Sequence, residues 1–156
     1  MTRPTPRASR ILIADDEVNI GQIVASILAA EGYDTRVVTN GFECIDTVRA
    51  ETFDLLLLDV GMPEMDGFQV CEALAVHCPE PRLPIILLTG RTDLETRVSG
   101  MHHGVTEYLT KPINRHELVA RVRAQLHIVT LTEQLDRIDR NIHATPAGAP
   151  DRNVRS

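Results

Sequence analysis

Acidic, hydroxyl and amine side chains follow short strand-like segments at four places in this chain. Asp15 and Asp16 follow residues 11–14, Asp59 follows residues 55–58, Thr89 follows residues 85–88, and Lys111 follows residues 107–110. Short apolar runs bounded by Gly or Pro are typical of strands that are buried on both faces of a parallel sheet. Because ligands bind at the carboxyl ends of parallel strands, we expect these polar side chains to meet at one edge of a sheet.

Three carboxylates at one edge predict a metal ion. Asp15, Asp16 and Asp59 would repel one another in a crevice unless a cation or protons neutralised them. Oxygen ligands without His or Cys select a hard ion, and a site with few carboxylates and several waters suits Mg²⁺ better than Ca²⁺. We therefore expect a Mg²⁺ site, in which Mn²⁺ can substitute.

Lys111 and Thr89 add a positive charge and a hydrogen-bond donor beside Asp59. Together with a metal ion, these groups could stabilise a phosphoryl group in transfer, and a carboxylate can accept it covalently. Taken singly, each residue has a simpler explanation, as a strand-end turn residue, a helix-start acid or a surface lysine. Their joint occurrence after four strands favours the chemical interpretation.

Strands alternate with helices along the chain. The pattern predicts strands at residues 11–14, 35–39, 55–58, 85–88 and 107–110, with helices between them and a last helix that begins at Asn114. The first helix is expected to bury Ile20, Ile23, Val24, Ile27 and Leu28, and the second Phe42, Ile45 and Val48. Asp66 and Gln69 have the spacing of a capping box, and Asp93 could cap a short helix. This alternation predicts a doubly wound α/β domain with a mostly parallel sheet.

Length and charge exclude several classes of protein. A chain of 156 residues is one domain by its length. Its net charge of -6 opposes binding to nucleic acid or to anionic membranes, so we expect no direct nucleic acid binding. No apolar run is long enough for membrane insertion or for a signal peptide, so we expect a cytoplasmic protein. Cys44, Cys71 and Cys78 are interpreted as reduced packing thiols.

Four motifs resemble the receiver domain of bacterial two-component response regulators. They are ILIADD at 11–16, LDVGMPEMDG at 58–67, LLTG at 87–90 and YLTKP at 108–112. The resemblance covers residues 10 to about 126 and implies a flavodoxin-like five-stranded parallel sheet of order 2-1-3-4-5. It also implies a phosphoacceptor signalling domain, rather than an enzyme, which takes a phosphoryl group from a histidine kinase or a phosphotransfer protein.

The resemblance also implies a role for each site residue. Asp59 would be the phosphoacceptor, Asp16, Asp59 and the Gly61 carbonyl direct metal ligands, Asp15 a ligand through water, and Lys111, Thr89 and Gly90 contacts of the phosphoryl group. Gly90 stands where the family more often has Ala, which keeps the position small. Thr89 and Tyr108 would report the phosphorylated state by changing the surface of the fourth helix, fifth strand and fifth helix. The Lys111-Pro112 bond would be cis.

The main alternative is an aspartate-nucleophile phosphohydrolase of α/β fold, which also uses Mg²⁺. Its Asp-x-Asp motif is missing, because Glu17 stands two residues after Asp15 and Gly61 two residues after Asp59. No second carboxylate takes the place of its general acid. A flavodoxin-like cofactor binder is a further alternative, but Asp15 and Asp16 stand where it would need a phosphate-binding loop.

The last helix is longer than the domain needs. We interpret residues 1–9 as a disordered arm, 10–126 as the receiver domain, 127–142 as a helical extension and 143–156 as a flexible tail. Apolar residues spaced by four and three predict a coiled-coil seam, and they are Ala124, Ile128, Leu131, Leu135, Ile138 and Ile142. The seam could pair with a second molecule or with a partner's helix. Alternatively, it could fold back onto its own domain or fray.

Overall fold

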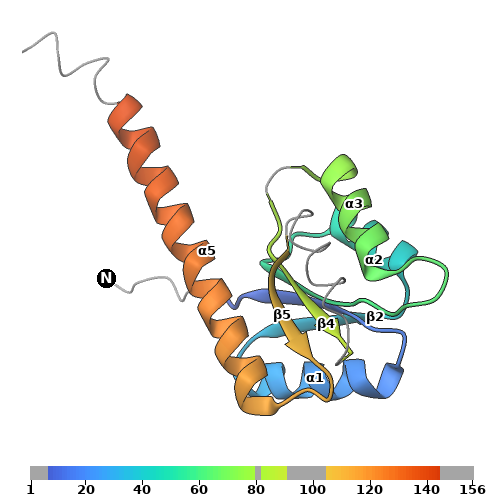
Figure 1. Cartoon of the computed structure of the whole chain (residues 1–156). Helices are drawn as coiled ribbons and strands as arrows, with labels where there is room; N and C mark the ends of the chain where they lie inside the picture. Colours follow the sequence, from blue (N-terminus) through green and yellow to red (C-terminus); the bar gives the residue numbers. More distant parts are fainter. Residues whose placement is uncertain (1–6, 80–81, 91–104, 145–156) are drawn as a thin grey trace, which may run out of the picture.

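The computed structural model describes residues 7–79, 82–90 and 105–144, which form a parallel sheet with helices on both faces (Figure 1). The strands are β1 Arg10–Ala14, β2 Asp34–Val38, β3 Leu55–Asp59, β4 Ile85–Thr89 and β5 Val105–Thr110. The helices are α1 Val18–Ala30, α2 Gly41–Ala50, α3 Gly67–His77 and α5 Arg115–Ala144. The strand order β2-β1-β3-β4-β5 confirms the predicted fold. The helix expected after Asp93 lies outside the described residues.

The central strands are buried along their whole length. Every residue of β3 and β4 is buried, and successive side chains point to opposite faces of the sheet. On one face Leu56 and Leu58 pack with residues of α2 and α3. On the other face Leu55 and Leu57 pack with residues of α1 and α5. The run of four leucines is therefore shared between two cores, and it holds the following residue, Asp59, at the carboxyl edge.

Polar side chains set the starts of three helices. The Asn40 side chain accepts a hydrogen bond from the Glu43 amide at the start of α2, and Asn114 accepts one from the Glu117 amide at the start of α5. Asp66 and Gln69 form the predicted capping box at the start of α3. These contacts satisfy amides that have no partner within the helix.

Two apolar residues expected on buried faces are exposed. Ile23 is 59% exposed, and Phe42 is 53% exposed. Each lies about 100° round its helix from a buried neighbour, Val24 and Gly41 respectively. The prediction was wrong for these two positions, because only a narrow stripe of each helix contacts the sheet.

The cysteines have the packing role that the sequence predicts. All three are free, and Cys44 and Cys71 are buried in the core between the sheet and α2 and α3. Burial, with smaller effects from nearby acidic groups, raises the pKa of both thiols to about 12. Thiols with so high a pKa are unreactive at neutral pH.

The last helix continues beyond the sheet. In Figure 1, α5 begins beside α1 and extends away from the domain as one unbroken helix. The expected cis peptide bond is present between Lys111 and Pro112, just before this helix. None of the described helices is both long and apolar enough to cross a membrane.

The close approach of α3 to β3 predicts the effect of a single methyl group. A Cβ atom on Gly67 would lie 2.9 Å from the Asp59 carbonyl oxygen and 3.0 Å from the Val60 Cα atom, and both are backbone atoms. We expect Gly67→Ala to lower the free energy of unfolding by about 1–3 kcal/mol, measured by urea denaturation. Gly61→Ala is the control, because a Cβ atom there meets nothing within 4 Å. An equal loss in both variants would contradict this explanation.

Candidate functional site

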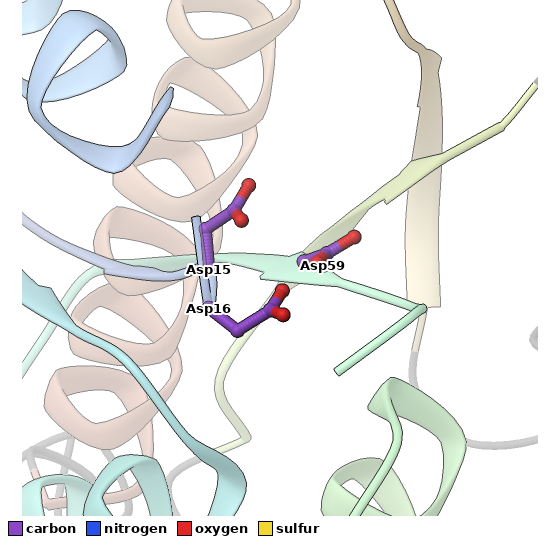
Figure 2. Close-up of side chains that lie close together, drawn as sticks. All are labelled: Asp15, Asp16 and Asp59. Atoms are coloured by element: carbon purple, nitrogen blue, oxygen red, sulfur yellow. The ribbon is translucent and has the colours of Figure 1, made fainter. Parts of the chain in front are cut away.

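Three carboxylates meet at the carboxyl edge of the sheet, as predicted. Figure 2 shows Asp15, Asp16 and Asp59 side by side, and oxygen atoms from the three lie within 4.8 Å of one another. The register explains this, because β1 and β3 pair in parallel with Ala14 opposite Leu58. Asp15 directly follows β1, and Asp59 is the last residue of β3. Both are buried, whereas Asp16 is more open to solvent.

Lys111 provides the positive charge of the site. It follows β5, and its Nζ atom lies 3.2 Å from Asp15 Oδ2 and 3.2 Å from Asp59 Oδ1. The Lys111 amide donates a 2.7 Å hydrogen bond to the Thr89 carbonyl. This hydrogen bond fixes the backbone of Lys111, from which the side chain extends to the two carboxylates. One ammonium group thus bridges the acidic ends of β1 and β3.

The charges of the site shift two pKa values in the same direction. Burial and then the negative charge of Asp15 raise the pKa of Asp59 to about 6, although Lys111 opposes this rise. Burial alone would lower the pKa of Lys111, but Asp59 and Asp15 outweigh it and raise this pKa. The Lys111 ammonium is therefore charged at neutral pH, yet it does not balance three carboxylates.

The donor set fits a hard divalent cation. It consists of carboxylate oxygens, and the remaining negative charge favours a cation beside them. The loop after β3 is folded around Asp59, whose Oδ1 accepts a 3.3 Å hydrogen bond from the Gly61 amide. Asp15 Oδ1 accepts a 2.9 Å hydrogen bond from the Glu17 amide. These contacts orient two of the carboxylates before any ligand arrives.

The remaining predicted residues lie on β4 and β5. Thr89 is buried at the end of β4, one residue beyond the position that pairs with Asp59, and its hydroxyl donates to the Gly90 carbonyl at 3.4 Å. Gly90 itself is exposed. Tyr108 pairs with Leu87 on the neighbouring strand and packs, partly buried, against the core that faces α2 and α3.

One contact was not predicted from the sequence. The Glu17 carboxylate lies 4.0 Å from Lys111 Nζ and is largely exposed. The position of Glu17 directly after Asp15 and Asp16 was the sequence feature that could have indicated this contact. The sequence does not show, however, how far the side chain of a lysine after β5 extends across the sheet. Glu17 therefore adds negative charge at the rim of the site.

Two curated relatives are regulators, and the part of each that matches this chain is about half of its length. The chain is 39% identical over 117 residues to the DNA-binding response regulator MtrA of Mycolicibacterium paratuberculosis, a match that covers 75% of this chain and 51% of that protein. It is 35% identical over 144 residues to the probable transcriptional regulator ycf27 of Cyanidium caldarium, with 92% and 56% covered. The chain thus spans about half the length of these relatives.

Solved structures share the fold. A CheY-like response regulator receiver domain protein from Methanospirillum hungatei JF-1 has a TM-score of 0.76 and 28% identity, with 81% of this chain and 99% of that chain covered. NtrX from Brucella abortus has a TM-score of 0.78 and 26% identity, with 85% and 30% covered.

The expectation of no direct nucleic acid binding was wrong. It rested on the net charge, but relatives of this chain are named DNA-binding response regulators. The physical reason is that the charge of one part of a protein carries no information about residues outside the matched part. Net charge limits only what this part of the chain binds.

The family comparison covers the whole site. The response regulator receiver domain family matches residues 11–123, which include β2 to β5, β1 except for Arg10, the three carboxylates and Lys111. This match extends over more than half of the chain and agrees with the strand order and with the named relatives. The chain therefore belongs to the response regulator receiver domain family of two-component signalling.

Proposed function

We propose that Asp59 accepts a phosphoryl group from a phosphohistidine of a histidine kinase or a phosphotransfer protein. The observation that carries this proposal is the contact of Asp59 Oδ1 with Lys111 Nζ at 3.2 Å, inside a cluster that also holds Asp15 and Asp16. Asp59 ends β3, the strand next to β1, and both the acidic residues that follow β1 and the amine that follows β5 reach it. A carboxylate so placed is a competent nucleophile with its counter-charge in position.

The transfer itself needs little from the protein beyond positioning. A carboxylate oxygen of Asp59 forms a bond to phosphorus as the P–N bond of the phosphohistidine breaks. The electron pair returns to the imidazole nitrogen, which then takes a proton from solvent. The Lys111 ammonium, the Thr89 hydroxyl and the Gly90 amide would bind the phosphoryl oxygens and stabilise their negative charge.

The acidic residues would hold Mg²⁺. In this proposal Asp16, Asp59 and the Gly61 carbonyl are direct ligands, Asp15 is a ligand through water, and Mn²⁺ can substitute. A bound ion would supply Lewis-acid stabilisation of the charge on the phosphoryl oxygens. Support comes from the all-oxygen donor set and from the unbalanced negative charge of the cluster.

Thr89 and Tyr108 would report the phosphorylated state. Among the described residues, the Thr89 hydroxyl donates to the neighbouring Gly90 carbonyl at 3.4 Å, a long hydrogen bond that a phosphoryl oxygen could replace. Tyr108 lies on the adjacent strand and is partly buried, so a shift of Thr89 would change its packing. A change of this kind would remodel the surface of β5 and α5, and the expected fourth helix, which belongs to the same predicted surface, lies outside the described residues.

The output of the domain would be control of DNA binding in a longer regulator. This part of the proposal rests on the named relatives, of which MtrA is called DNA-binding and ycf27 a probable transcriptional regulator. In this role the domain signals and is not an enzyme with its own substrate. Neither relative supports the phosphohydrolase alternative. The expectation of a cytoplasmic protein stays a prediction.

Phosphorylation is the first prediction of this proposal. Incubated with acetyl phosphate and Mg²⁺, the protein should gain the mass of one phosphoryl group, measured by intact mass spectrometry. Asp59→Ala should lower the phosphorylated fraction at least about 100-fold, and Asp16→Asn should weaken both phosphorylation and its dependence on Mg²⁺. Asp46→Asn, a change at an exposed carboxylate of α2, is the control and should leave the reaction unchanged. Wild-type labelling of Asp59→Ala would contradict the assignment, and rapid turnover of p-nitrophenyl phosphate would favour the phosphohydrolase.

The raised pKa of Asp59 predicts how stability depends on pH. Between about pH 4 and pH 6, folded protein without metal retains a proton on Asp59 that the unfolded chain has released. The free energy of unfolding of the wild type should therefore fall, relative to Asp59→Asn, as the pH rises through this window. The variant should be more stable by about 1–2 kcal/mol above pH 7 in EDTA, with little difference near pH 4.

Mg²⁺ provides the control for this measurement. Because the ion would neutralise the carboxylate of Asp59, Mg²⁺ at pH 7.5 should stabilise the wild type more than the variant. Urea denaturation at several pH values gives both quantities. A difference between the two proteins that stays constant from pH 4 to pH 8 would contradict the raised pKa.

The proposed switch predicts a change in backbone protection. Beryllofluoride with Mg²⁺ imitates a phosphoryl group, so it should alter the amide hydrogen exchange of β5, Val105–Thr110, by several-fold. Asp59→Ala should show no such response, which separates specific binding from a solvent effect. Identical exchange of β5 in wild type with and without the ligand would remove the switch from the proposal.

A further inference from the structure

A stripe of large apolar residues on α5 is exposed. It is formed by Ile128, Leu131, Leu135, Ile138 and Ile142, which are 54%, 45%, 65%, 54% and 59% exposed, together with the smaller Ala124. We call these six residues the α5 stripe. Their spacings of four and three residues place them along one side of the helix, in the pattern by which two helices pair.

The α5 stripe does not continue the face that packs on the domain. Leu118, Val122 and Leu126 are buried against the sheet. Ile128 follows Leu126 by two residues, which places it about 200° further round the helix. The α5 stripe therefore lies on the side of α5 that is turned away from its own domain. It is not a continuation of the buried face of the helix beyond the end of the core.

The same side of the helix is charged where it passes the domain. Glu117 and Arg121 occupy the two positions that precede the α5 stripe in its spacing. The Arg121 guanidinium lies 3.8 Å from the Glu117 carboxylate and 2.7 Å from that of Glu107. This side becomes apolar only from Ala124, close to Leu126, the last residue of α5 that is buried in the core. The apolar surface thus belongs to the extension alone.

The charges of the extension favour a second copy of this chain as the partner. Beside the α5 stripe stand Thr132 and Asp139 on one flank and His127, Gln134 and Asn141 on the other. Of these only Asp139 carries a charge at neutral pH when the histidine is neutral. In coiled coils, charges at such flanking positions select a helix of complementary charge from another protein. Like charges at these positions repel a second copy of the same helix. Two copies of this helix meet without such repulsion.

We propose that residues 124–142 of two chains pair through the α5 stripe as a two-stranded coiled coil. Covering the stripe on both chains removes on the order of 1,000 Å² of surface from water, which is at the lower limit for a specific interface. The pairing is short, so we expect a dissociation constant of about 1 μM and a dimer that is populated well above that concentration.

The dimer leaves the acidic site open. The segment before α5 carries Lys111 at the carboxyl edge of the sheet, and α5 then runs back along the sheet to the other edge. There Arg123 lies 2.9 Å from Glu31, which follows the end of α1. The extension therefore projects from the edge opposite Asp59. For this reason the pairing does not depend on phosphorylation.

Sedimentation of the whole chain in reducing buffer tests the proposal. Wild type at about 20 μM is expected to be mainly a dimer, and Leu131→Asp with Leu135→Asp should raise its dissociation constant at least about 100-fold and give a monomer at the same concentration. The matched control is Thr130→Asp with Arg137→Gln, which changes the net charge by the same amount on the side of the helix opposite the α5 stripe and should remain a dimer. Circular dichroism checks that all three proteins keep their folded domain.

A second comparison separates this dimer from one that needs activation. Asp59→Asn without Mg²⁺ should be as dimeric as wild type, because the α5 stripe is exposed without phosphorylation. A wild type that sediments as a monomer would overturn the proposal, and the stripe would then be left to a different protein. A dimer that survives the double aspartate substitution, or that forms only with beryllofluoride, would also overturn it.

Discussion

Electrostatic repulsion among three carboxylates is the constraint that the rest of the domain has to satisfy. Asp15 and Asp59 are buried beside each other, with Asp16 within reach, and the Lys111 ammonium is the one cation that contacts them in the part of the chain that the structure describes. Carboxylates that could move would separate or turn to water. They stay together because the paired register of β1 and β3 fixes their backbones. Burial of the leucines on both faces of β3 supplies the free energy that offsets this repulsion.

The same tension prepares the site for ligands. Because burial and Asp15 raise the pKa of Asp59, its charged form is less stable in the free protein than in water. Any cation that binds beside it relieves part of this strain, so ion binding, ionisation of Asp59 and stability are linked. Hydrogen bonds from the Gly61 and Glu17 amides keep two carboxylates oriented, which leaves little reorganisation for a ligand to bring about.

The sequence predicted the elements of the site better than its contacts. Leucine runs and the Asp66 capping box are local signals, so the strands and the start of α3 followed from them. The strand order came from a family resemblance, since local patterns do not say which strands are neighbours. Ile23 and Phe42 were misplaced because periodicity does not tell how wide the buried stripe of a helix is. The bridge from Lys111 to two strands, and its approach to Glu17, depend on how β5 sits in the sheet.

The helix α5 links the acidic site at one edge of the sheet to the exposed α5 stripe beyond the opposite edge. α5 has 30 residues and starts just after the segment that carries Lys111, while its exposed stripe lies beyond the opposite edge of the sheet. Leu118, Val122 and Leu126 fasten it to the same core that contains Leu57 and Leu109. Because this helix is packed only over its first part, substitutions in the extension leave the core and the acidic site intact. The first part of α5 also forms the Arg121–Glu107 and Arg123–Glu31 ion pairs, so any influence of one end on the other passes through this packed part of the helix.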